Sequence, residues 1–348
     1  MSRRRIAIVT GGRSSEHEIA LASARSVVDA LDPARYDVVT VEIGRDGTWA
    51  LPAGSPRAEL EREAGAPAET LPVPASSNGV VATLSEVDVV IPVLHGPFGE
   101  DGTVQGLLEL AGKAYVGAGV LGSAVAMDKD VFKVLMRGAG VPVTESVTIR
   151  IGDAPEHPFD YPVFVKPARL GSSVGITKIR SADELEDAVA LARRHDEKVL
   201  IEAFVDGIEV EVGVLGNRDP RPQASLPGEI VAHGFAGTDW YDYSSKYDEG
   251  GMDLIVPPRI PQDVSRRVQD LAVDAFIACE CEGMARVDCF VTGDGDVLVN
   301  ELNTIPGFTA TSVFARLFEA SGIPYAELLD RLVGLALERF ERERALRH

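Results

Sequence analysis

Four side chains near the C-terminal end of the sequence could bind a metal ion and a phosphate group together. They are Arg286, Asp288, Glu301 and Asn303. Alternating apolar and polar residues on both sides of Asp294 and Gly295 predict a β-hairpin, because Asp-Gly between such runs is typical of a tight turn. If these two residues form the turn, Asp288 faces Glu301. Arg286 then faces Asn303, and all four side chains lie on one side, because strand side chains repeat every two residues.

The donor atoms of this hairpin indicate which metal it could hold. Carboxylate and amide oxygens without histidine or cysteine suit a hard cation such as Mg2+, which usually completes its octahedron with water and substrate phosphate. The polar face is expected to be exposed. The opposite face is expected to pack inward and comprises Val287, Cys289, Val291, Leu298 and Leu302. A surface hairpin with a cross-strand ion pair is the alternative, and a three-residue turn would spoil the alignment.

Composition limits the functions that the chain can have. Its 348 residues, 45% of them hydrophobic, allow two or three domains with sizeable cores. Acidic residues outnumber basic ones by 54 to 34, for a formal net charge of -20, so general attraction to nucleic acid or an anionic membrane is not expected. No apolar run is long enough to span a bilayer, and no signal-peptide core follows the arginines at positions 3–5, which predicts a cytoplasmic protein.

The order of the expected elements indicates an α/β fold. The first part should contain strands at 6–10, 36–43 and 87–94 and helices at 16–31 and 103–111. Such alternation predicts a parallel sheet, whose ligands gather at the carboxyl ends of the strands. Residues 50–80, rich in Ala, Pro, Gly and Ser, are expected to form a variable excursion.

The later part mixes helices and strands. It should contain a helix at 129–138, strands at 162–166 and 198–202 around a helix at 182–194, and helices from 311 and 325 onward. The three cysteines, Cys279, Cys281 and Cys289, lack CxxC spacing and are expected to be buried thiols, not a zinc or redox site.

A loop that leaves one of these strands could bind phosphate. Residues 166–175 are dense in glycine and serine, so backbone amides can surround phosphate oxygens while Lys166 supplies charge. The loop lacks the Walker A ending, and a flexible turn is the alternative. Residues 202–205 follow an apolar strand, and such an edge can offer backbone hydrogen bonds to an adenine.

Two further segments have both a structural and a functional interpretation. Ser15 and Glu18 fit a capping box at the start of a helix. Glu16 has no such duty, so it could bind a ligand ammonium or compensate the helix dipole. Residues 240–251 are aromatic and irregular, which suits either a closing lid or an ordinary packed surface loop.

With these pieces placed, the chain resembles the D-alanine:D-alanine ligases of the ATP-grasp superfamily over essentially its full length. The resemblance rests on residues 11–18, 95–102, 127–129, 166–175, 241–247, 286–288 and 300–307. It implies a three-domain ATP-grasp architecture, with an N-terminal parallel α/β domain (Rossmann-like) at 1–125, a central ATP-grasp subdomain at 126–212, and a C-terminal ATP-grasp subdomain with lid loop and metal site at 213–348.

The resemblance also implies roles for individual residues. The contacts to ATP would come from Lys129, Lys166, Ser173, Glu202, Phe204, Val205 and Glu209, and the metal ligands would be Asp288, Glu301 and Asn303. Glu16, Ser172 and Tyr247 would form a network that binds the first D-alanine and closes the lid, with His95 nearby. Arg286 and the backbone of Gly307 would stabilise the tetrahedral intermediate, and Lys246 and Ser312 would bind the carboxylate of the second substrate.

The implied reaction joins two D-alanine molecules through an acyl phosphate, for peptidoglycan precursor synthesis. Its cofactors would be ATP and two Mg2+ or Mn2+ ions, with K+ as a further candidate, and the protein would be a homodimer. Two alternatives stay open: a D-alanine:D-lactate ligase, which Lys246 and Tyr247 disfavour, and a catalytically silent ATP-binding regulator. Ala203 and Ala315 depart from the family pattern, and the first puts one ATP contact in doubt.

Overall fold

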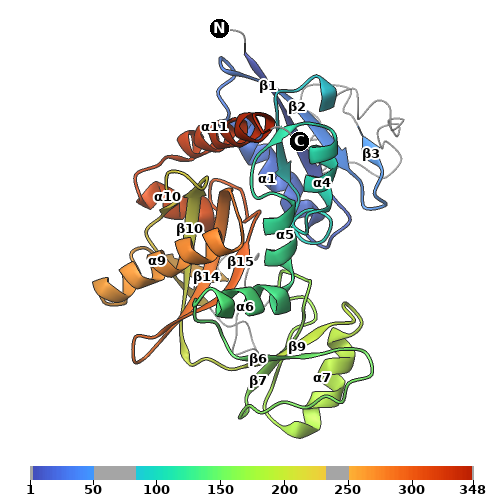
Figure 1. Cartoon of the computed structure of the whole chain (residues 1–348), viewed down its shortest axis with the longest axis vertical. Coiled ribbons are helices and arrows are strands. Elements are labelled where there is room, and N and C mark those ends of the chain that lie inside the picture. The colour runs from blue at the N-terminus through green and yellow to red at the C-terminus, as the bar shows by residue number, and fades with distance from the viewer. Residues whose placement is uncertain (1–2, 51–83, 233–250, 347–348) are drawn as a thin grey trace.

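The computed structural model describes residues 3–50, 84–232 and 251–346. Three β-sheets follow one another along the long axis of the molecule, with helices packed against each (Figure 1). The excursion expected at 50–80 and most of the lid expected at 240–251 lie outside the described residues. Within the described parts, none of the helices combines the length and apolar character that a bilayer-spanning segment requires.

The first sheet has the parallel α/β arrangement expected from the sequence. Its elements are β1 (Arg4–Gly11), α1 (His17–Ala30), β2 (Tyr36–Ile43), β3 (Trp49–Ala50), β4 (Val89–Val93), α4 (Thr103–Leu110) and β5 (Ala114–Tyr115). The strand order is β3-β2-β1-β4-β5, and only β3 runs antiparallel to its neighbour. Because the parallel strands all end at one edge, the loops after β1 and β4 lie next to each other.

The second sheet is smaller and antiparallel. The chain reaches it through α5 (Val120–Met127) and α6 (Lys129–Gly138), and the sheet region comprises β6 (Ser146–Ile149), β7 (Val163–Pro167), β8 (Thr177–Ile179), η2 (Ala182–Glu184), α7 (Leu185–Ala192) and β9 (Val199–Ala203). The strand order is β6-β9-β7-β8. The helix expected at 182–194 is a 3-10 turn followed by α7, which ends at Ala192.

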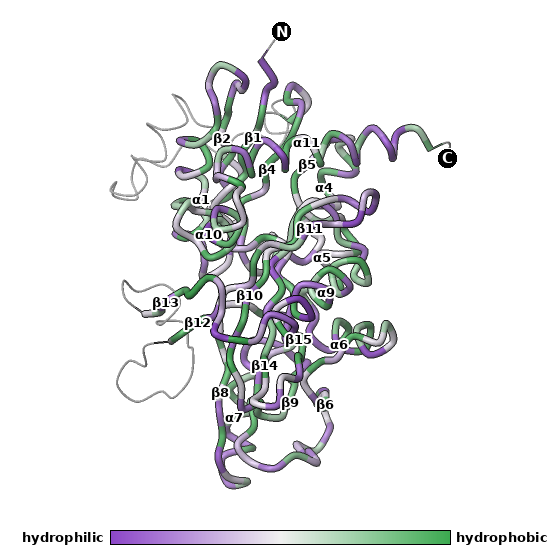
Figure 2. Tube along the Cα trace, turned by 90° about the vertical axis from the view of Figure 1, so that its left-hand side faces the viewer, coloured by the Kyte–Doolittle hydropathy of each residue, from purple (hydrophilic) through white to green (hydrophobic). Residues whose placement is uncertain are grey.

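The third sheet forms the centre of the molecule. It comprises β10 (Gly207–Gly216), β11 (Gln223–Ala224), β12 (Gly228–Ala232), β13 (Met252–Ile255), β14 (Gly283–Thr292) and β15 (Val297–Asn303), and its helices are α9 (Gln262–Ala278), α10 (Val313–Ala320) and α11 (Tyr325–Arg344). Helices α6 and α9 pack on the same face of β14 and β15 (Figures 1 and 2). The domain boundary predicted between residues 212 and 213 falls inside β10, which belongs to a single sheet. The proposed domain boundaries remain a prediction.

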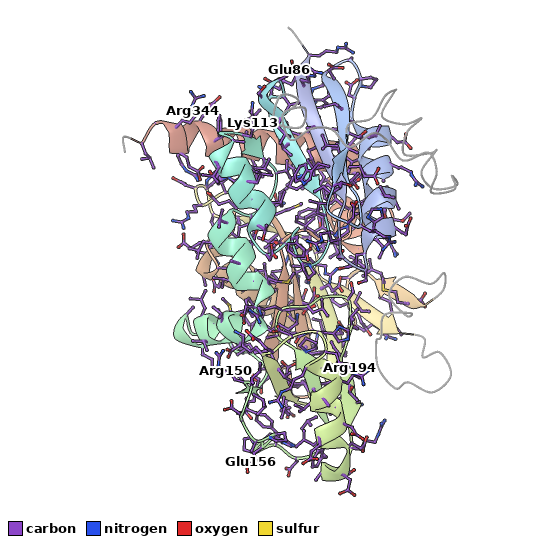
Figure 3. All side chains as sticks on the ribbon, turned by 90° about the vertical axis from the view of Figure 1, so that its right-hand side faces the viewer. Glu86, Lys113, Arg150, Glu156, Arg194 and Arg344 are labelled. Carbon is purple, nitrogen blue, oxygen red and sulfur yellow. The ribbon has the colours of Figure 1, made fainter. Side chains whose placement is uncertain are left out.

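The last helix returns to the first sheet. Leu328 and Leu332 of α11 share an apolar core with Ile8 of β1 and Val89 of β4. Arg339 of the same helix is buried and donates hydrogen bonds to the backbone oxygens of Gly117 and Tyr115. The N- and C-terminal parts of the chain are thereby joined, while charged side chains such as those of Arg150, Glu156, Arg194 and Arg344 lie on the outside (Figure 3).

The hairpin of β14 and β15 has the expected pairing at the site but not the expected turn. Thr292 donates its N–H to Asp296, and Gly295 donates to Thr292, so residues 293–295 form a three-residue turn. Gly295 has φ +84°, the left-handed conformation that this kind of turn requires. The prediction of a two-residue turn was wrong.

A β-bulge restores the alignment that the longer turn would have shifted. Asp288 pairs with Glu301, but the next pair is Cys289 with Val299, which leaves Asn300 as the extra residue. Between the turn and the bulge, the side chains of β15 therefore lie on the opposite face of the sheet from the one predicted. Val299 is fully buried, and Leu298, predicted to face inward, lies on the other side, beside Phe290.

Two smaller predictions have opposite outcomes. The capping box is absent, because α1 begins at His17 with Glu16 as its N-cap and makes no side-chain cap hydrogen bond. The carboxylate of Glu18 instead accepts a hydrogen bond from Arg45. The three cysteines are free and buried, as predicted.

Candidate functional site

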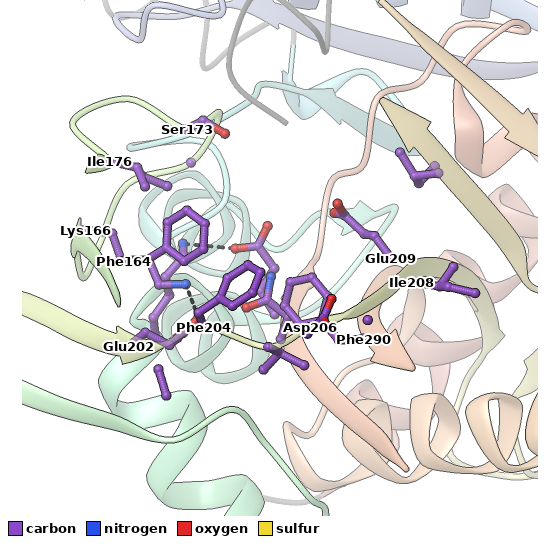
Figure 4. Close-up of a pocket in the computed structure, with 18 of the residues that line it drawn as sticks. Phe164, Lys166, Ser173, Ile176, Glu202, Phe204, Asp206, Ile208, Glu209 and Phe290 are labelled. Carbon is purple, nitrogen blue, oxygen red and sulfur yellow. Dashed lines mark hydrogen bonds and ion pairs between the residues drawn. The ribbon is translucent and has the colours of Figure 1, made fainter. Parts of the chain in front are cut away.

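A cavity of about 440 Å³ lies between the second and third sheets (Figure 4). All seven residues expected to contact ATP line it: Lys129, Lys166, Ser173, Glu202, Phe204, Val205 and Glu209. They come from α6, β7, the loop after β7, β9, the connection between β9 and β10, and the start of β10. The fold thus brings together residues that are up to 80 positions apart, from 129 to 209.

One wall of this cavity is aromatic and apolar. The rings of Phe164 and Phe204 lie 6.3 Å apart, and the ammonium of Lys178 lies 4.3 Å from the centre of the Phe204 ring. Ile176 and Phe290 also line the cavity. Flat apolar walls suit a planar aromatic ring such as a nucleobase. Phe164, Ile176, Lys178 and Phe290 were not singled out from the sequence; an apolar strand residue such as Phe164 or Phe290 reads as core.

The side chain of Glu202 does not face the aromatic wall. It is buried, and its carboxylate accepts a hydrogen bond from Lys166 at 2.7 Å. The sequence placed residues 202–205 at an adenine-binding edge, and all four residues line the cavity. The carboxylate instead lies between Lys166 and a second lysine, Lys133, which sequence reasoning missed.

A second cavity, of about 460 Å³, adjoins the first. The two share Gly171, Ser172 and Glu301 in their walls. The second cavity is lined by α1, by loops of the first sheet, and by strands and loops of the third sheet, and its wall includes Glu16, His95, Arg286, Asn303, Gly307 and Ser312. Two ligands bound in these cavities would therefore meet at the loop after β7.

Glu16 and Ser172 meet across these two cavities, as the sequence predicted. The Ser172 hydroxyl donates a hydrogen bond to the carboxylate of Glu16, which is buried. Ser172 and Ser173 both have positive φ, 53° and 57°, so the loop turns sharply at this point. The third proposed member of the network, Tyr247, and the neighbouring Lys246 lie outside the described residues.

Two titratable groups beside Glu16 favour their neutral forms. Burial lowers the pKa of His95, although the charge of Glu16 opposes this effect. The Nδ1 atom of His95 lies 3.0 Å from the backbone oxygen of Ile305, which fits a donated hydrogen bond. Burial and the charge of Glu16 raise the pKa of Glu100 well above its ordinary value. Glu100 lines the second cavity, and the sequence gave it no role although it lies in the 95–102 motif.

Arg286 lines the second cavity and forms an ion pair with Asp288, which does not itself line the cavity. Two nitrogens of Arg286 donate to the two oxygens of Asp288, each at 2.7 Å, and Arg286 Nε lies 3.0 Å from Glu211. Burial by itself would lower the pKa of Arg286, but the negative charges of Asp288 and Glu211 have a larger effect and raise this pKa. The guanidinium therefore stays charged. Asp288, expected at an exposed position, is only 2% exposed because its partners cover it.

Glu301 lies where the two cavities join. Its carboxylate is 3.2 Å from the ammonium of Lys129, which also donates to the backbone oxygen of Leu170. Next to it, the bulge residue Asn300 has a buried amide oxygen that accepts no hydrogen bond from the described residues. The oxygen donors of Glu301 and Asn300 are thus neighbours on the chain near Lys129, and oxygen donors of this kind are what Mg2+ prefers.

Comparisons with known proteins decide the family. The model of the D-ala D-ala ligase N-terminus matches residues 5–118, and that of the D-ala D-ala ligase C-terminus matches residues 135–334. The chain belongs to the D-alanine–D-alanine ligase family.

Relatives of this ligase family match nearly the whole chain. The D-alanine–D-alanine ligase of Mycolicibacterium smegmatis is 47% identical over 360 residues, which cover 97% of this chain and 96% of the relative. That of Nocardia farcinica is 46% identical, and the match covers 97% and 98% of the two chains. These values confirm the resemblance predicted from the motifs.

Solved ligase structures share the fold. The D-alanine-D-alanine ligase from Coxiella burnetii has a TM-score of 0.83 and 34% identity, covering 99% of this chain and 97% of its own. The VanG D-Ala:D-Ser ligase from Enterococcus faecalis has a TM-score of 0.84 and 36% identity, covering 96% and 100%. The ATP-grasp fold class is thereby confirmed.

The remaining candidate residues of the ligase, Gly307 and Ser312, lie in the segment that leads into α10. Ser312 is the N-cap of this helix, and its hydroxyl accepts a hydrogen bond from the N–H of Thr309 at 3.1 Å. A Cβ added at Gly307 would lie 3.2 Å from the Ser312 oxygen, so a side chain there would crowd the second cavity. Gly307 and Ser312 are therefore neighbours on the cavity wall, as their proposed roles require.

Proposed function

We propose that this chain joins two D-alanine molecules to D-alanyl-D-alanine and converts ATP to ADP and phosphate. The observation that carries the proposal is the junction of the two cavities at Ser172 and Glu301. One cavity has the aromatic wall and lysines that suit a nucleotide. The other has a buried carboxylate, Glu16, and a partly buried guanidinium, Arg286, which suit an amino acid.

In the first step, the carboxylate of one D-alanine attacks the γ-phosphorus of ATP. An acyl phosphate forms, and the bond to ADP breaks. Lys129 and Lys166 would hold the phosphate groups, and Glu16 would hold the ammonium of the amino acid. Such catalysis is mostly positioning and charge neutralisation, because phosphoryl transfer needs little covalent help from the protein.

In the second step, the amine of another D-alanine attacks the acyl carbon. The new N–C bond forms, negative charge grows on the carbonyl oxygen until phosphate leaves with its electron pair, and the neutral amine gives up one proton so that the amide keeps one N–H. Arg286 and the backbone N–H of Gly307 would stabilise that oxygen, as donors in an oxyanion hole do. Lys246 and Ser312 would bind the carboxylate of this second D-alanine.

We also propose Asp288, Glu301 and Asn303 as the residues that hold Mg2+. The amide nitrogen of Asn303 donates to Asp288 at 3.0 Å, so its amide oxygen is directed away from that carboxylate. Bound there, Mg2+ would neutralise negative charge on the phosphate groups of ATP. Mn2+ accepts the same oxygen donors, and two ions with K+ as an activator are the family expectation.

An assay of ADP release tests the proposed function. With ATP, Mg2+ and D-alanine alone, we expect ADP and D-alanyl-D-alanine in equal amounts, with the product identified by mass. Parallel reactions contain D-alanine with D-lactate or with D-serine, because a solved relative is a D-Ala:D-Ser ligase. A mixed product that exceeds the dipeptide would reassign the second substrate. No ADP release under any condition would favour a silent ATP-binding regulator.

Ser172→Ala is expected to raise the KM for D-alanine about threefold to tenfold, since a hydrogen bond of this kind contributes roughly 0.5–1.5 kcal/mol. The substitution removes the hydroxyl that holds Glu16. Ser173→Ala is the matched control, because residue 173 has nearly the same backbone conformation but lines only the first cavity. It should raise the KM for ATP instead. Equal effects of both variants on the two substrates would contradict the assignment.

The family resemblance further supports a homodimer that works in the cytoplasm. Light scattering on the purified protein would test the oligomeric state, with a mass of about twice the chain mass of 37.1 kDa expected. A monomer mass at assay concentration would contradict this part of the proposal.

A further inference from the structure

Lys133 lies beneath the first cavity and has no direct access to it. Its side chain is fully buried on α6, and it does not line either cavity. Its ammonium donates a hydrogen bond to the Thr144 hydroxyl and lies 2.9 Å from Oε2 of Glu202. The other oxygen of Glu202, Oε1, lies 2.7 Å from the ammonium of Lys166. Glu202 thus joins a buried lysine to a lysine in the cavity wall.

The charges of this cluster do not cancel. Two lysines share one carboxylate, so the three side chains together carry one positive charge. Burial alone would raise the pKa of Glu202, but Lys133 and Lys166 outweigh it and lower the pKa to about 2. Glu202 is therefore an anion. If Lys133 were absent, Glu202 would pair with Lys166 alone and cancel its charge.

Packing alone does not account for a lysine at this position. A charge in a fully buried place costs free energy, and apolar residues of similar volume often replace buried ion pairs without loss of stability. Lys133 and Lys129 are four residues apart and lie on the same side of α6. Lys129 lines the cavity near Glu301, whereas Lys133 contacts Glu202, the partner of Lys166. The helix thus places one lysine at the cavity wall and the other behind it.

We propose that Lys133 is a positioning residue for ATP: it balances the charge of Glu202, so that Lys166 keeps a net positive charge toward the phosphate groups. This inference rests on the proposed use of the first cavity by ATP. Lys133 acts at a distance through Glu202, so its removal should weaken ATP binding and leave the D-alanine site intact.

The first test is Lys133→Met, which keeps the length of the side chain and removes its charge. We expect the Kd for ATP, measured by calorimetry with Mg2+, to rise about tenfold, because one unit charge near the phosphates is effectively cancelled. The KM for D-alanine should change less than about twofold. Arg331→Met is the control, since it removes a charge from an exposed position of α11 that is not among the groups acting on Lys133. It should leave both constants unchanged.

The decisive test compares Lys133→Met in two backgrounds, the wild-type protein and Glu202→Gln. In the Glu202→Gln background Lys133 has no carboxylate to balance, so adding Lys133→Met should raise the Kd for ATP by less than about threefold relative to Glu202→Gln alone. A merely structural role of Lys133 predicts the same rise of about tenfold in both backgrounds. That result, or an unchanged Kd in folded Lys133→Met, would overturn the proposal. Thermal unfolding of each variant establishes that it is folded.

A pH profile gives a separate readout. Burial lowers the pKa of Lys133 to about 8; Glu202 opposes this shift, and Lys166 and Arg137 add to it. Wild-type ATP affinity should therefore fall as the pH rises through about 8, and Lys133→Met should lack this change. The same slope in both proteins would count against the proposal. Because these tests measure ATP binding, they remain valid even if the wild-type protein binds ATP without making a dipeptide.

Discussion

Glu301→Gln is expected to lower the rate of ADP release on the order of 100-fold or more, with the fold intact. The substitution keeps the size of the side chain and removes the charge that would hold Mg2+ beside the phosphate groups. Glu301 is partly exposed, at 20% of its side-chain surface, and its ion pair with Lys129 lies at the cavity wall. Loss of its charge should therefore leave the thermal unfolding temperature nearly unchanged.

The measurement is the rate of ADP release with D-alanine over a titration of Mg2+, and then of Mn2+. Glu327→Gln serves as the control, because Glu327 is exposed on α11 and pairs only with Arg331 among the described residues. It should keep the wild-type rate. A Glu301→Gln rate close to wild type at saturating Mg2+ would remove Glu301 from the metal site.

Arg286→Met is expected to abolish ligation and to destabilise the protein by about 3–5 kcal/mol, because breaking a buried ion pair leaves its partners uncompensated. Asp288 and Glu211 both depend on this guanidinium, and both are only 2% exposed. The change in the free energy of unfolding can be measured by urea denaturation.

Arg286→Lys separates catalysis from stability. Lysine keeps the positive charge but cannot reproduce the paired contacts to the two oxygens of Asp288. We expect a smaller loss of stability than in Arg286→Met, together with a strong loss of dipeptide formation. If Arg286→Lys ligates D-alanine at the wild-type rate, the proposed stabilisation of the carbonyl oxygen by Arg286 is wrong.

Local patterns in the sequence determined the strands and the facing of Asp288 and Glu301. Alternation with a period of two is a property of the strand itself, so it can be read without knowledge of the partner strand. The turn has one residue more than predicted, and the bulge at Asn300 restores the pairing of Asp288 with Glu301. Neither feature has a clear signal in the alternation, so Leu298 was assigned to the wrong face.

The order of the motifs was enough to assign the family, which the comparisons confirm. Family motifs are short and local, so they can be recognised in the sequence without knowing which segments are in contact. For the same reason, the roles that they imply for single residues remain predictions.

Only the tertiary structure decided which charges share one environment. The contact of Glu16 with Ser172 joins residues 156 positions apart, and Glu202 meets Lys133 and Lys166 from three different elements. The burial of Asp288 and the presence of Glu211 beside Arg286 have no signal in the local sequence. Burial and electrostatic pairing depend on distances through space, which are set by the packing of the sheets and helices and not by spacing along the chain.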